Sequence, residues 1–358
     1  MAQPDQRASV VGLGVIGGSL SLALKRLGWA VTGSDLDRDH AAAAVRQGVI
    51  DDVADLVHPD SDVVFVATPP STLPAVIGEV LVECSCPVTD TGSVKSAVVA
   101  SCDNPRFVPG HPMSGSELSR LEGASPSLFE GATWVLTPTE STDEGALSTV
   151  MSLVQQFKAE LRLMDATDHD HLVAAVSHLP HLAATALINS AFGQAQGHEP
   201  VLARLAAGGF RDMTRVASSD LDIWLDICTQ NRPAITSVLD EYIHRLVELR
   251  DLIDHEEHEV TRHALTSAFD QARRSRATLP VQPPKQVELV VQLTADQKVV
   301  TVLQIATALD VSVKDHYVTN GATMSELHLS VLQSQVDLLR GGLAAKGIKV
   351  DDPEELSN

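Results

Sequence analysis

Residues 10–19 read Val10-Val11-Gly12-Leu13-Gly14-Val15-Ile16-Gly17-Gly18-Ser19, which predicts an apolar strand, a glycine-rich turn and the start of a helix. The glycines at positions 12, 14 and 17 have the spacing G-x-G-x-x-G. In this pattern the first glycine permits a tight turn, the second lets the backbone approach a pyrophosphate, and the third lets the helix pack closely on the strand. Amides at the helix N-terminus then face the phosphate charge. The stretch predicts a dinucleotide-binding unit whose cofactor contacts come from Gly12, Leu13, Gly14, Val15, Ile16 and Gly17.

An acidic residue follows at the distance that such a unit requires. A second predicted strand, Trp29–Gly33, leads into Asp35, which lies 18 residues after Gly17. We expect its carboxylate to accept hydrogen bonds from the adenosine ribose hydroxyls, which favours NAD. Arg38 lies close by and would suit a 2′-phosphate, so NADP stays open.

Composition limits the classes of partner. The chain has 358 residues, enough for two or three domains, and 44% are hydrophobic, enough for a sizeable core. A formal net charge of -21 argues against nucleic acid and anionic membranes as partners. We identify no uninterrupted apolar segment long enough to span a bilayer. The four cysteines show neither C-x-x-C nor zinc spacing, which favours reduced thiols and a cytoplasmic location.

Residues 1–166 alternate predicted strands with predicted helices, which indicates a mostly parallel Rossmann-like sheet covered on both faces. Ligands of such α/β domains bind at the carboxyl ends of the strands. The loop Thr68-Pro69-Pro70 ends one strand, so Thr68 and Pro69 join the predicted cofactor contacts. The predicted strands are Ser9–Val11, Ala30–Gly33, Val63–Ala67, Pro87–Asp90, Arg106–Pro109, Thr133–Thr137 and Leu161–Met164.

The remaining chain changes character twice. Residues 167–272 lose the strand signals and read as long helices, with an alanine-rich face over 169–191 that suits a dimer interface or packing within one chain. Residues 273–286 read as an extended linker with three prolines. Residues 287–350 read as a small α+β domain in the order βαββαβ, with a final strand at Ile348–Val350.

Two polar segments end strands of the predicted sheet. His111 follows the strand Arg106–Pro109, at the edge where the nicotinamide should lie, and a histidine suits a general base because its pKa is near neutral. Ser93 follows the strand Pro87–Asp90. Its hydroxyl would either hydrogen-bond His111 or cap a helix.

Further polar candidates lie in the helical region. Pro180 should kink the helix that carries His178 and His181. These histidines, with His169, His171, Asp168 and Asp170, also suit a metal, but the spacing is not H-E-x-x-H and no cysteine completes a site, so we predict none. Arg215 would grip a carboxylate through two hydrogen bonds, or would pair on the surface with Asp212, Asp220 or Asp222. Trp224 suits either the core or a pocket wall.

These segments together resemble the prephenate/arogenate dehydrogenase (TyrA-type) family of tyrosine biosynthesis. The resemblance covers about residues 9–270 and rests on five segments in order: Gly12–Gly18, Asp90–Lys95, His111–Glu117, Ser177–His181 and Gly208–Arg215. It implies NAD-dependent oxidative decarboxylation of prephenate to 4-hydroxyphenylpyruvate, or of arogenate to tyrosine. It further implies that His111 is the catalytic base, Ser93 supports it, His181 lines the substrate pocket and Arg215 binds the ring carboxylate. Gly208, Asp212 and Trp224 match neighbouring pocket positions.

The same resemblance implies an interlocked homodimer, and residues 287–350 resemble an ACT domain with tyrosine as the natural effector. Two other functions compete with this one. A β-hydroxyacid dehydrogenase or imine reductase would need a catalytic base such as a lysine on the helical domain, and residues 167–265 contain no lysine. A non-catalytic NAD-binding regulatory protein would not need His111, Ser93 and Arg215 together.

Overall fold

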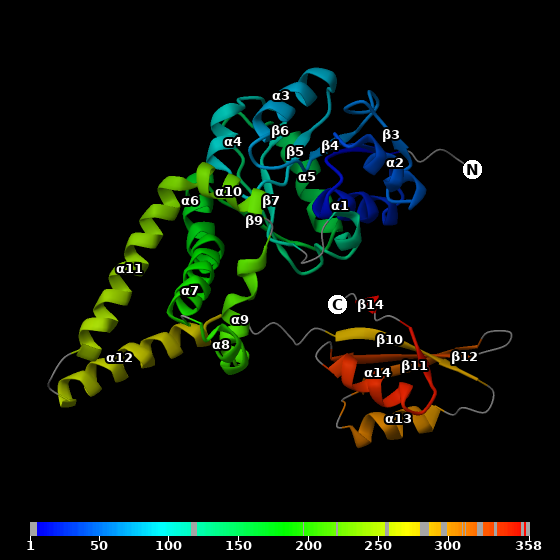
Figure 1. Ribbon diagram of the computed structural model, residues 1–358. Coiled ribbons are helices and arrows are strands. Elements are labelled where there is room, and N and C mark those ends of the chain that lie inside the picture. The colour runs from blue at the N-terminus through cyan, green and yellow to red at the C-terminus, as the bar shows by residue number, and fades with distance from the viewer. Residues whose placement is uncertain are drawn as a thin grey trace. The chain divides into compact units, whose positions relative to one another are not determined.

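The computed structural model (Figure 1) divides into two units, residues 1–251 and 252–358. The described residues are 6–115, 120–195, 197–219, 221–254, 258–279, 286–294, 299–309, 311, 313–320, 325–332, 335–351 and 354–355. Two predictions fall outside them, namely Asp220 as a partner of Arg215 and the proline-containing part of the linker, residues 280–285.

The first unit begins with a six-stranded parallel sheet in the order β3-β2-β1-β4-β5-β6. Its central strands consist largely of buried valine, alanine and phenylalanine, as expected for a sheet covered on both faces. Five of these six strands were predicted, and their observed bounds lie within two residues of the predicted ones, whereas β3 was not predicted. The six strands are β1 (Arg7–Val11), β2 (Ala30–Ser34), β3 (Asp52–Val53), β4 (Val63–Val66), β5 (Val88–Asp90) and β6 (Phe107–Val108).

Helices cover both faces of this sheet (Figure 1). One face packs on α1 (Val15–Arg26), α2 (Arg38–Arg46) and α5 (Glu144–Gln156) in a core that includes Val10 and Phe65. The other face packs on α3 (Leu73–Glu83) and α4 (Ser96–Ser101). The arrangement is the Rossmann-like domain that the alternation of elements predicted.

A second, smaller sheet corrects the expectation of a single one. It has the order β7-β8-β9, with β7 (Gly110–Pro112) antiparallel to β8 (Thr133–Leu136) and β9 (Glu160–Leu163) parallel to it. The change of direction follows Pro109, which has no amide to donate to a neighbouring strand. A Cβ atom at Gly110 would lie 2.9 Å from the Asp90 carbonyl oxygen, so the turn requires glycine. His111 therefore lies on a strand rather than in the predicted loop.

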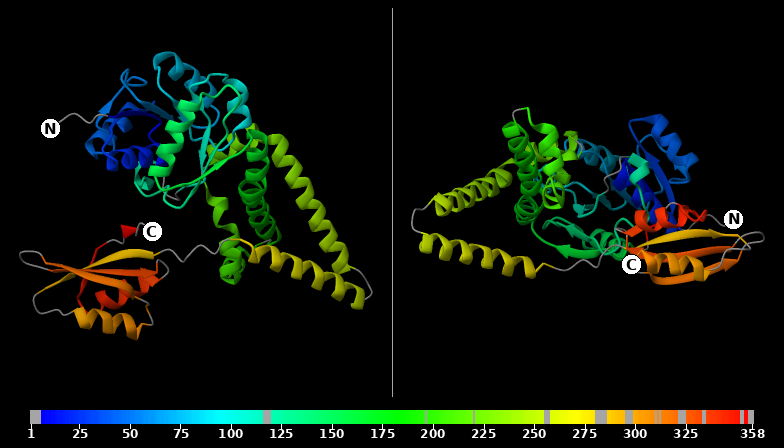
Figure 2. Two further views of the ribbon diagram at one scale, coloured as in Figure 1. Left: turned by 180° about the vertical axis from the view of Figure 1, so that it is seen from behind. Right: turned by 60° about the horizontal axis from the view of Figure 1, so that its bottom comes forward.

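The helical region of the first unit is built around one continuous helix, residues 166–195 (Figure 2). It consists of α6 (Ala166–Val173), the π-helical segment η2 (Ala174–His178) and α7 (Leu179–Ala195). Pro180, which has no amide to donate, lies two residues after η2. The irregularity predicted there as a kink is thus present as a π-helical turn. The other elements are α8 (Glu199–Leu205), α9 (Gly208–Thr214), the 3₁₀ turn η3 (Arg215–Ser218), α10 (Leu221–Gln230) and α11 (Arg232–Asp254).

This helix corrects the expectation that no apolar segment is long enough to span a bilayer. Residues 166–195 form a helix of 30 residues that is long and apolar enough to cross a membrane by length and composition alone. Of its most apolar window, 28% is buried within the chain. Buried His169, Asp170, His178 and His181 lie on the same helix. His169 and Asp170 contact the Rossmann-like domain, and His178 and His181 contact the neighbouring helices, so this helix buries polar side chains within the chain.

In the second unit, α12 (His258–Ala277) corrects the prediction that the linker starts at residue 273. Residues 271–277 contain glutamine, alanine, serine and arginine but no proline, so the helix continues through them. The rest confirms the predicted βαββαβ order, with an antiparallel sheet in the order β11-β12-β10-β13 and its own apolar core. The bounds are β10 (Gln286–Leu293), α13 (Val299–Ala308), β11 (Val313–Asn320), β12 (Ser325–Leu332), α14 (Val336–Ala344), β13 (Lys349–Val350) and β14 (Glu354–Glu355).

Candidate active site

The glycine-rich turn has the geometry that a dinucleotide phosphate needs. Gly12 has a φ of +89°, and a Cβ atom there would lie 2.6 Å from the Ala67 carbonyl oxygen. A Cβ atom at Gly17 would lie 1.8 Å from the Gly12 carbonyl oxygen. Gly14, by contrast, faces open space in the described part of the chain, and α1 begins there without a side-chain cap or an acidic first turn. Its amides are therefore available to an anion.

The acidic residue that should bind the ribose is fixed beside this turn. The Asp35 carboxylate accepts hydrogen bonds from the amides of Leu13, at 2.9 Å, and Asp37, at 2.9 Å. Its oxygens retain further lone pairs for hydroxyl groups. Thr68 Oγ1 and Ser114 Oγ are buried without a hydrogen-bond partner in the described structure. The free amides, the fixed carboxylate and these two hydroxyls fit NAD; Ser114 was not among the cofactor residues predicted from the sequence.

The predicted base, His111, is the first member of a buried polar chain. Its Nδ1 lies 2.8 Å from Nε2 of His169, and Nδ1 of His169 lies 2.8 Å from Oδ1 of Asp170. His169 is completely buried and Asp170 nearly so. Burial holds the pKa of His111 well below its usual value, and the neighbouring His169 and Lys95 side chains also lower it. His111 is therefore neutral near pH 7, as a general base must be.

Asp170 joins this chain to the start of α4. Its Oδ1 and Oδ2 accept hydrogen bonds from the backbone amides of Lys95 and Ser96, both at 2.8 Å. Burial raises the pKa of Asp170, but the hydrogen bonds from His169 and these amides outweigh it, so the pKa is lowered and the carboxylate is ionised. Asp170 thus supplies the cap that Ser93 was one candidate to provide. The Ser93 hydroxyl has no hydrogen bond to any described residue, including His111.

A buried ion pair lies on the other side of His111. The Lys95 ammonium donates to Asp90 Oδ2 and, at 2.7 Å, to the Gly110 carbonyl oxygen. Asp90 also accepts from the amides of Gly92, at 2.8 Å, and Gly110, at 3.0 Å. Burial lowers the pKa of Lys95, and the charge of Asp90 opposes this effect. The pair fixes the backbone of the residue that precedes His111.

A second group of side chains forms on the helical region. The ring of His181 stacks on Trp224 with centroids 3.6 Å apart, and His178 meets the same indole edge-on at 6.0 Å. Asn231 Nδ2 donates to the Asp170 carbonyl oxygen at 2.8 Å and lies 3.3 Å from His178 Nδ1. Both ring nitrogens of buried His181 lack a partner in the described structure. A buried imidazole in this state is suited to bind a polar ligand.

The remaining predicted substrate residues follow on α9 and η3, which pack against α7. Gly208 and Asp212 belong to α9, and Arg215 begins η3; all three are exposed. Their segment thus contacts the helix that carries His181. Trp224 lies on α10, whose Asp226 accepts two hydrogen bonds from Ser71, in the loop that follows Thr68 and Pro69. These bonds tie the predicted cofactor loop to the predicted substrate wall.

Sequence reasoning missed His169, Asp170, Asn231 and Lys95 as members of the site. The Asp-His-Asp-His run at residues 168–171 was visible, but its spacing suggested only a metal. The described residues contain no group of three or more His, Cys, Asp or Glu that could hold a metal ion, and all four cysteines are free. Lys95 lies within the segment Asp90–Lys95, yet nothing in that segment indicates that its ammonium forms an ion pair with Asp90.

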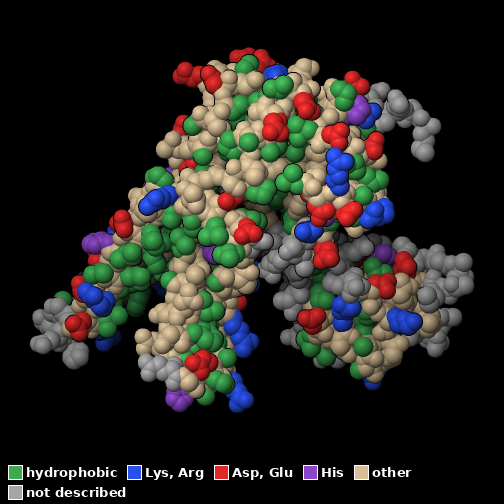
Figure 3. Space-filling view, turned by 45° about the horizontal axis from the view of Figure 1, so that its top comes forward, with side chains coloured by type: hydrophobic (Ala, Val, Ile, Leu, Met, Phe, Trp, Pro, Cys, Tyr) green, Lys and Arg blue, Asp and Glu red, His purple; other side chains and the backbone are tan. Residues whose placement is uncertain are grey.

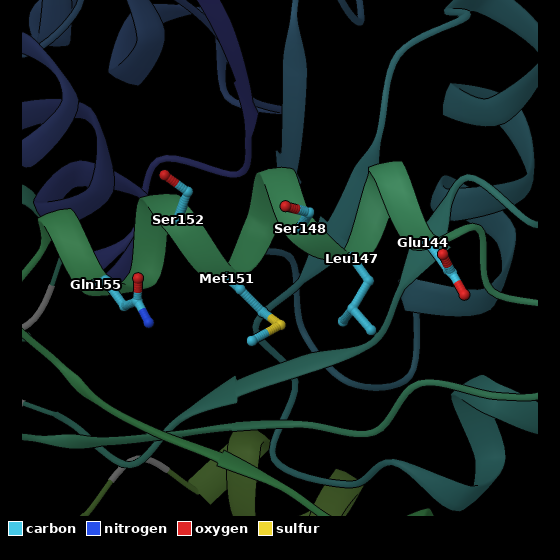
Figure 4. Close-up of a pocket in the computed structure, with 6 residues that line it drawn as sticks. All are labelled: Glu144, Leu147, Ser148, Met151, Ser152 and Gln155. Carbon is cyan, nitrogen blue, oxygen red and sulfur yellow. The ribbon is translucent and has the colours of Figure 1, made fainter.

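The pocket drawn in Figure 4 lies apart from these groups in the sequence. All six of its lining residues come from the outer face of α5, and none belongs to the site described above (Figure 4). The lining residues are Glu144, Leu147, Ser148, Met151, Ser152 and Gln155.

Comparison with known proteins identifies two consecutive family models in the chain. The family model described as prephenate dehydrogenase, nucleotide-binding domain, matches residues 20–163, and that described as prephenate dehydrogenase, dimerization domain, matches residues 165–268. The first covers most of the Rossmann-like domain, and the second begins just before α6.

Individual relatives agree with the family models. Prephenate dehydrogenase of Bacillus subtilis (strain 168) is 34% identical over 294 residues, which cover 78% of each chain. Cyclohexadienyl dehydrogenase of Zymomonas mobilis is 32% identical over 289 residues, 76% of this chain and 95% of that one. The crystal structure of prephenate dehydrogenase from A. aeolicus with hydroxyphenyl propionate and NAD+ has a TM-score of 0.69 and 30% identity, covering 76% of this chain and 100% of that one. This chain belongs to the prephenate dehydrogenase family of NAD-dependent oxidoreductases.

Proposed function

We propose that this chain is an NAD-dependent prephenate dehydrogenase that produces 4-hydroxyphenylpyruvate for tyrosine biosynthesis in the cytoplasm. The observation that carries the proposal is the half-buried His111, hydrogen-bonded to His169 at the carboxyl edge of the sheet and held neutral by the lowering of its pKa, in a domain whose glycine-rich turn fits NAD. Relatives named prephenate dehydrogenase, at 34% and 30% identity, support the choice of substrate.

The residues of this chain supply a base, an anchor and alignment. NAD+, held by the glycine-rich turn and Asp35, would supply the acceptor for the hydride at C4 of the substrate ring. His111 accepts the proton of the C4 hydroxyl as the C4–H bond breaks, and Ser93 is proposed to orient that hydroxyl. The C1–carboxylate bond then breaks, carbon dioxide leaves, and its electron pair completes the aromatic ring. His111 returns its proton to the phenolate oxygen, so the base is regenerated.

Substrate binding is assigned to the helical region. Arg215 is proposed to hold the ring carboxylate through two hydrogen bonds, which a guanidinium provides without donating a proton. His181, Trp224, Gly208 and Asp212 are proposed to line the same pocket. A local cation is needed because a chain with a net charge of -21 otherwise repels an anionic substrate.

Residues 287–350 are proposed to be an ACT-like regulatory domain, and the enzyme a homodimer. The βαββαβ order and the antiparallel sheet support the first assignment. The match to a dimerization-domain model supports the second. Tyrosine is the proposed effector of the regulatory domain.

The test is steady-state formation of NADH from prephenate or arogenate, with NAD+ or NADP+, in the presence and absence of tyrosine. We expect prephenate with NAD+ to give the highest kcat/KM and tyrosine to reduce the rate. Turnover of arogenate alone would change the substrate assignment, and no turnover of either compound would refute the proposed activity.

The decisive variant is His111→Asn, which removes the base and leaves a side chain of similar polarity. Loss of a general base lowers kcat by about 10²–10⁴-fold with a modest change in KM. A kcat close to that of the unmodified enzyme would remove His111 from the role.

A further inference from the structure

The buried polar chain behind His111 contains two groups that the proposed mechanism leaves without a role. His169 and Asp170 continue the chain from His111 into α6, with both links at 2.8 Å. We propose that they are positioning residues that keep the His111 ring in one tautomer, with the lone pair on Nε2, and that stabilise the charge the ring acquires. This role rests on the proposed function of His111 as the base.

The hydrogen bonds determine the tautomer. The ionised Asp170 carboxylate can only accept, so Nδ1 of His169 must be the donor to it. A His169 ring that carries only this proton has its lone pair on Nε2, which accepts the Nδ1 proton of His111. The remaining nitrogen of His111, Nε2, therefore carries the lone pair that accepts a proton from substrate.

The same contacts favour the protonated ring after the transfer. The groups that face His111 are His169 and Asp170 on α6, His178 on η2, and Lys95 before α4. Lys95 is paired with Asp90, and of the four facing groups Asp170 alone favours a positive charge on His111. Because its carboxylate is fixed by two backbone amides, it need not reorganise when the charge appears.

A purely structural role is the alternative, because Asp170 also ties α6 to the start of α4. The two roles differ in what they alter. A structural role affects thermal stability and all kinetic constants together, whereas a positioning role affects kcat and its pH dependence and leaves the binding of NAD+ unchanged.

The first experiment compares His169→Phe with His169→Gln and with His171→Phe, a control at an exposed residue of the same helix. Phenylalanine keeps a planar ring but neither accepts nor donates, so we expect kcat to fall about 10²–10³-fold with KM for prephenate within about threefold. Glutamine restores an acceptor for His111 and should recover at least about tenfold of that loss. The control should match the unmodified enzyme. A kcat for His169→Phe within about threefold of the unmodified value would overturn the proposal.

The second experiment measures pH profiles of Asp170→Asn. Burial depresses the pKa of His111 and Asp170 raises it, so the base form is lost only as pH falls through a value well below 6.5. Without the carboxylate this acid limb should move to lower pH, while the kcat plateau falls. A limb that stays in place would contradict the charge-stabilising role. NMR of nitrogen-15-labelled histidine rings gives a readout that is independent of turnover. The His111 signal is assigned by its loss in His111→Asn. It should report a protonated Nδ1, and His169→Phe should abolish this preference.

Failure of this proposal is distinguishable from failure of the proposed function. An inactive His111→Asn together with a fully active His169→Phe would remove the positioning role and keep the base. An active His111→Asn would remove the base itself.

Discussion

The Rossmann-like domain and the helical region of the first unit differ in how much of their apolar surface is buried within the chain. In the Rossmann-like domain, two clusters enclose both faces of the six-stranded sheet, and residues such as Val10 and Phe65 are completely buried. In the helical region the corresponding cluster has three buried residues, Ala174, Ile227 and Ile235. The first domain carries its own core, whereas the second leaves most of its apolar side chains without cover.

The uncovered side chains lie on several helices of the region. The space-filling view shows hydrophobic side chains in extended patches along the projecting helices (Figure 3). Extended exposed apolar patches are typical of contact surfaces between proteins. Together with the match to a dimerization-domain model, they indicate that a second copy completes the packing. Large exposed side chains of the region include Leu172, Val176, Phe192, Val201, Leu205, Met213, Leu221, Ile223, Leu225, Ile243, Leu246 and Val247.

The largest expected effect comes from charging this surface. Ile243 and Leu246 lie three residues apart on one face of α11 and are 49% and 47% exposed. Because about half of each side chain remains exposed, its burial in a dimer would contribute about 0.7–1.5 kcal/mol. Burial of a carboxylate in its place adds a desolvation penalty, so Ile243→Asp with Leu246→Asp should raise the dissociation constant about 10²–10⁴-fold. Sedimentation velocity over a dilution series measures the change.

The matched control lies in the other region. Val82 on α3 is 87% exposed, and Val82→Asp should leave the mass unchanged because that domain buries its own core. An undiminished dimer mass in the double variant at low micromolar concentration would mean that α11 is not part of the interface.

The difference between the two regions also explains what could be predicted from the sequence. In the Rossmann-like domain, strands alternate with helices at short range, and the glycine spacing defines a turn by local backbone sterics, so Gly12, Gly17 and Asp35 could be placed. The direction change at Pro109 could not, because β7 pairs with β8, more than 20 residues further along the chain. Its antiparallel pairing depends on tertiary contacts, which the local sequence pattern does not reveal.

The site itself was predictable where a residue belongs to a motif and not where it serves one. His111 and His181 stand in recognisable segments. His169 and Asp170 act through contacts with His111 and with the amides of Lys95 and Ser96, which are about 60 and 75 residues away in the sequence. Such partners are determined by the packing of α6 against the Rossmann-like domain, which composition and periodicity do not reveal.

An intermediate effect is expected where the helical region meets the substrate. Arg215→Ala should raise KM for prephenate about 10–10²-fold, the equivalent of one or two charge-assisted hydrogen bonds, with a smaller change in kcat. Arg204→Ala on the neighbouring helix α8 is the control for loss of an exposed arginine. An unchanged KM, measured by NADH formation over a range of prephenate concentrations, would exclude Arg215 as the anchor.

The smallest expected effect tests the junction between the two regions. Ser71 Oγ and its amide both donate to Asp226 Oδ2, at 2.5 and 3.0 Å, and thereby join the loop after β4 to the helix that carries Trp224. Ser71→Ala removes the first bond and leaves the second, a loss of about 0.5–1.5 kcal/mol, so KM for NAD+ should rise about two- to tenfold.

The control for this change is Thr229→Val, which removes a hydroxyl that bonds only within α10. If the bond couples the two regions, Ser71→Ala and Asp226→Ala should have non-additive effects on KM in a double-mutant cycle, because each removes the same interaction. Additive effects would mean that the cofactor loop keeps its position without the helical region. The two regions would then contribute to one site without energetic coupling through this hydrogen bond, and the Rossmann-like domain alone would determine cofactor affinity.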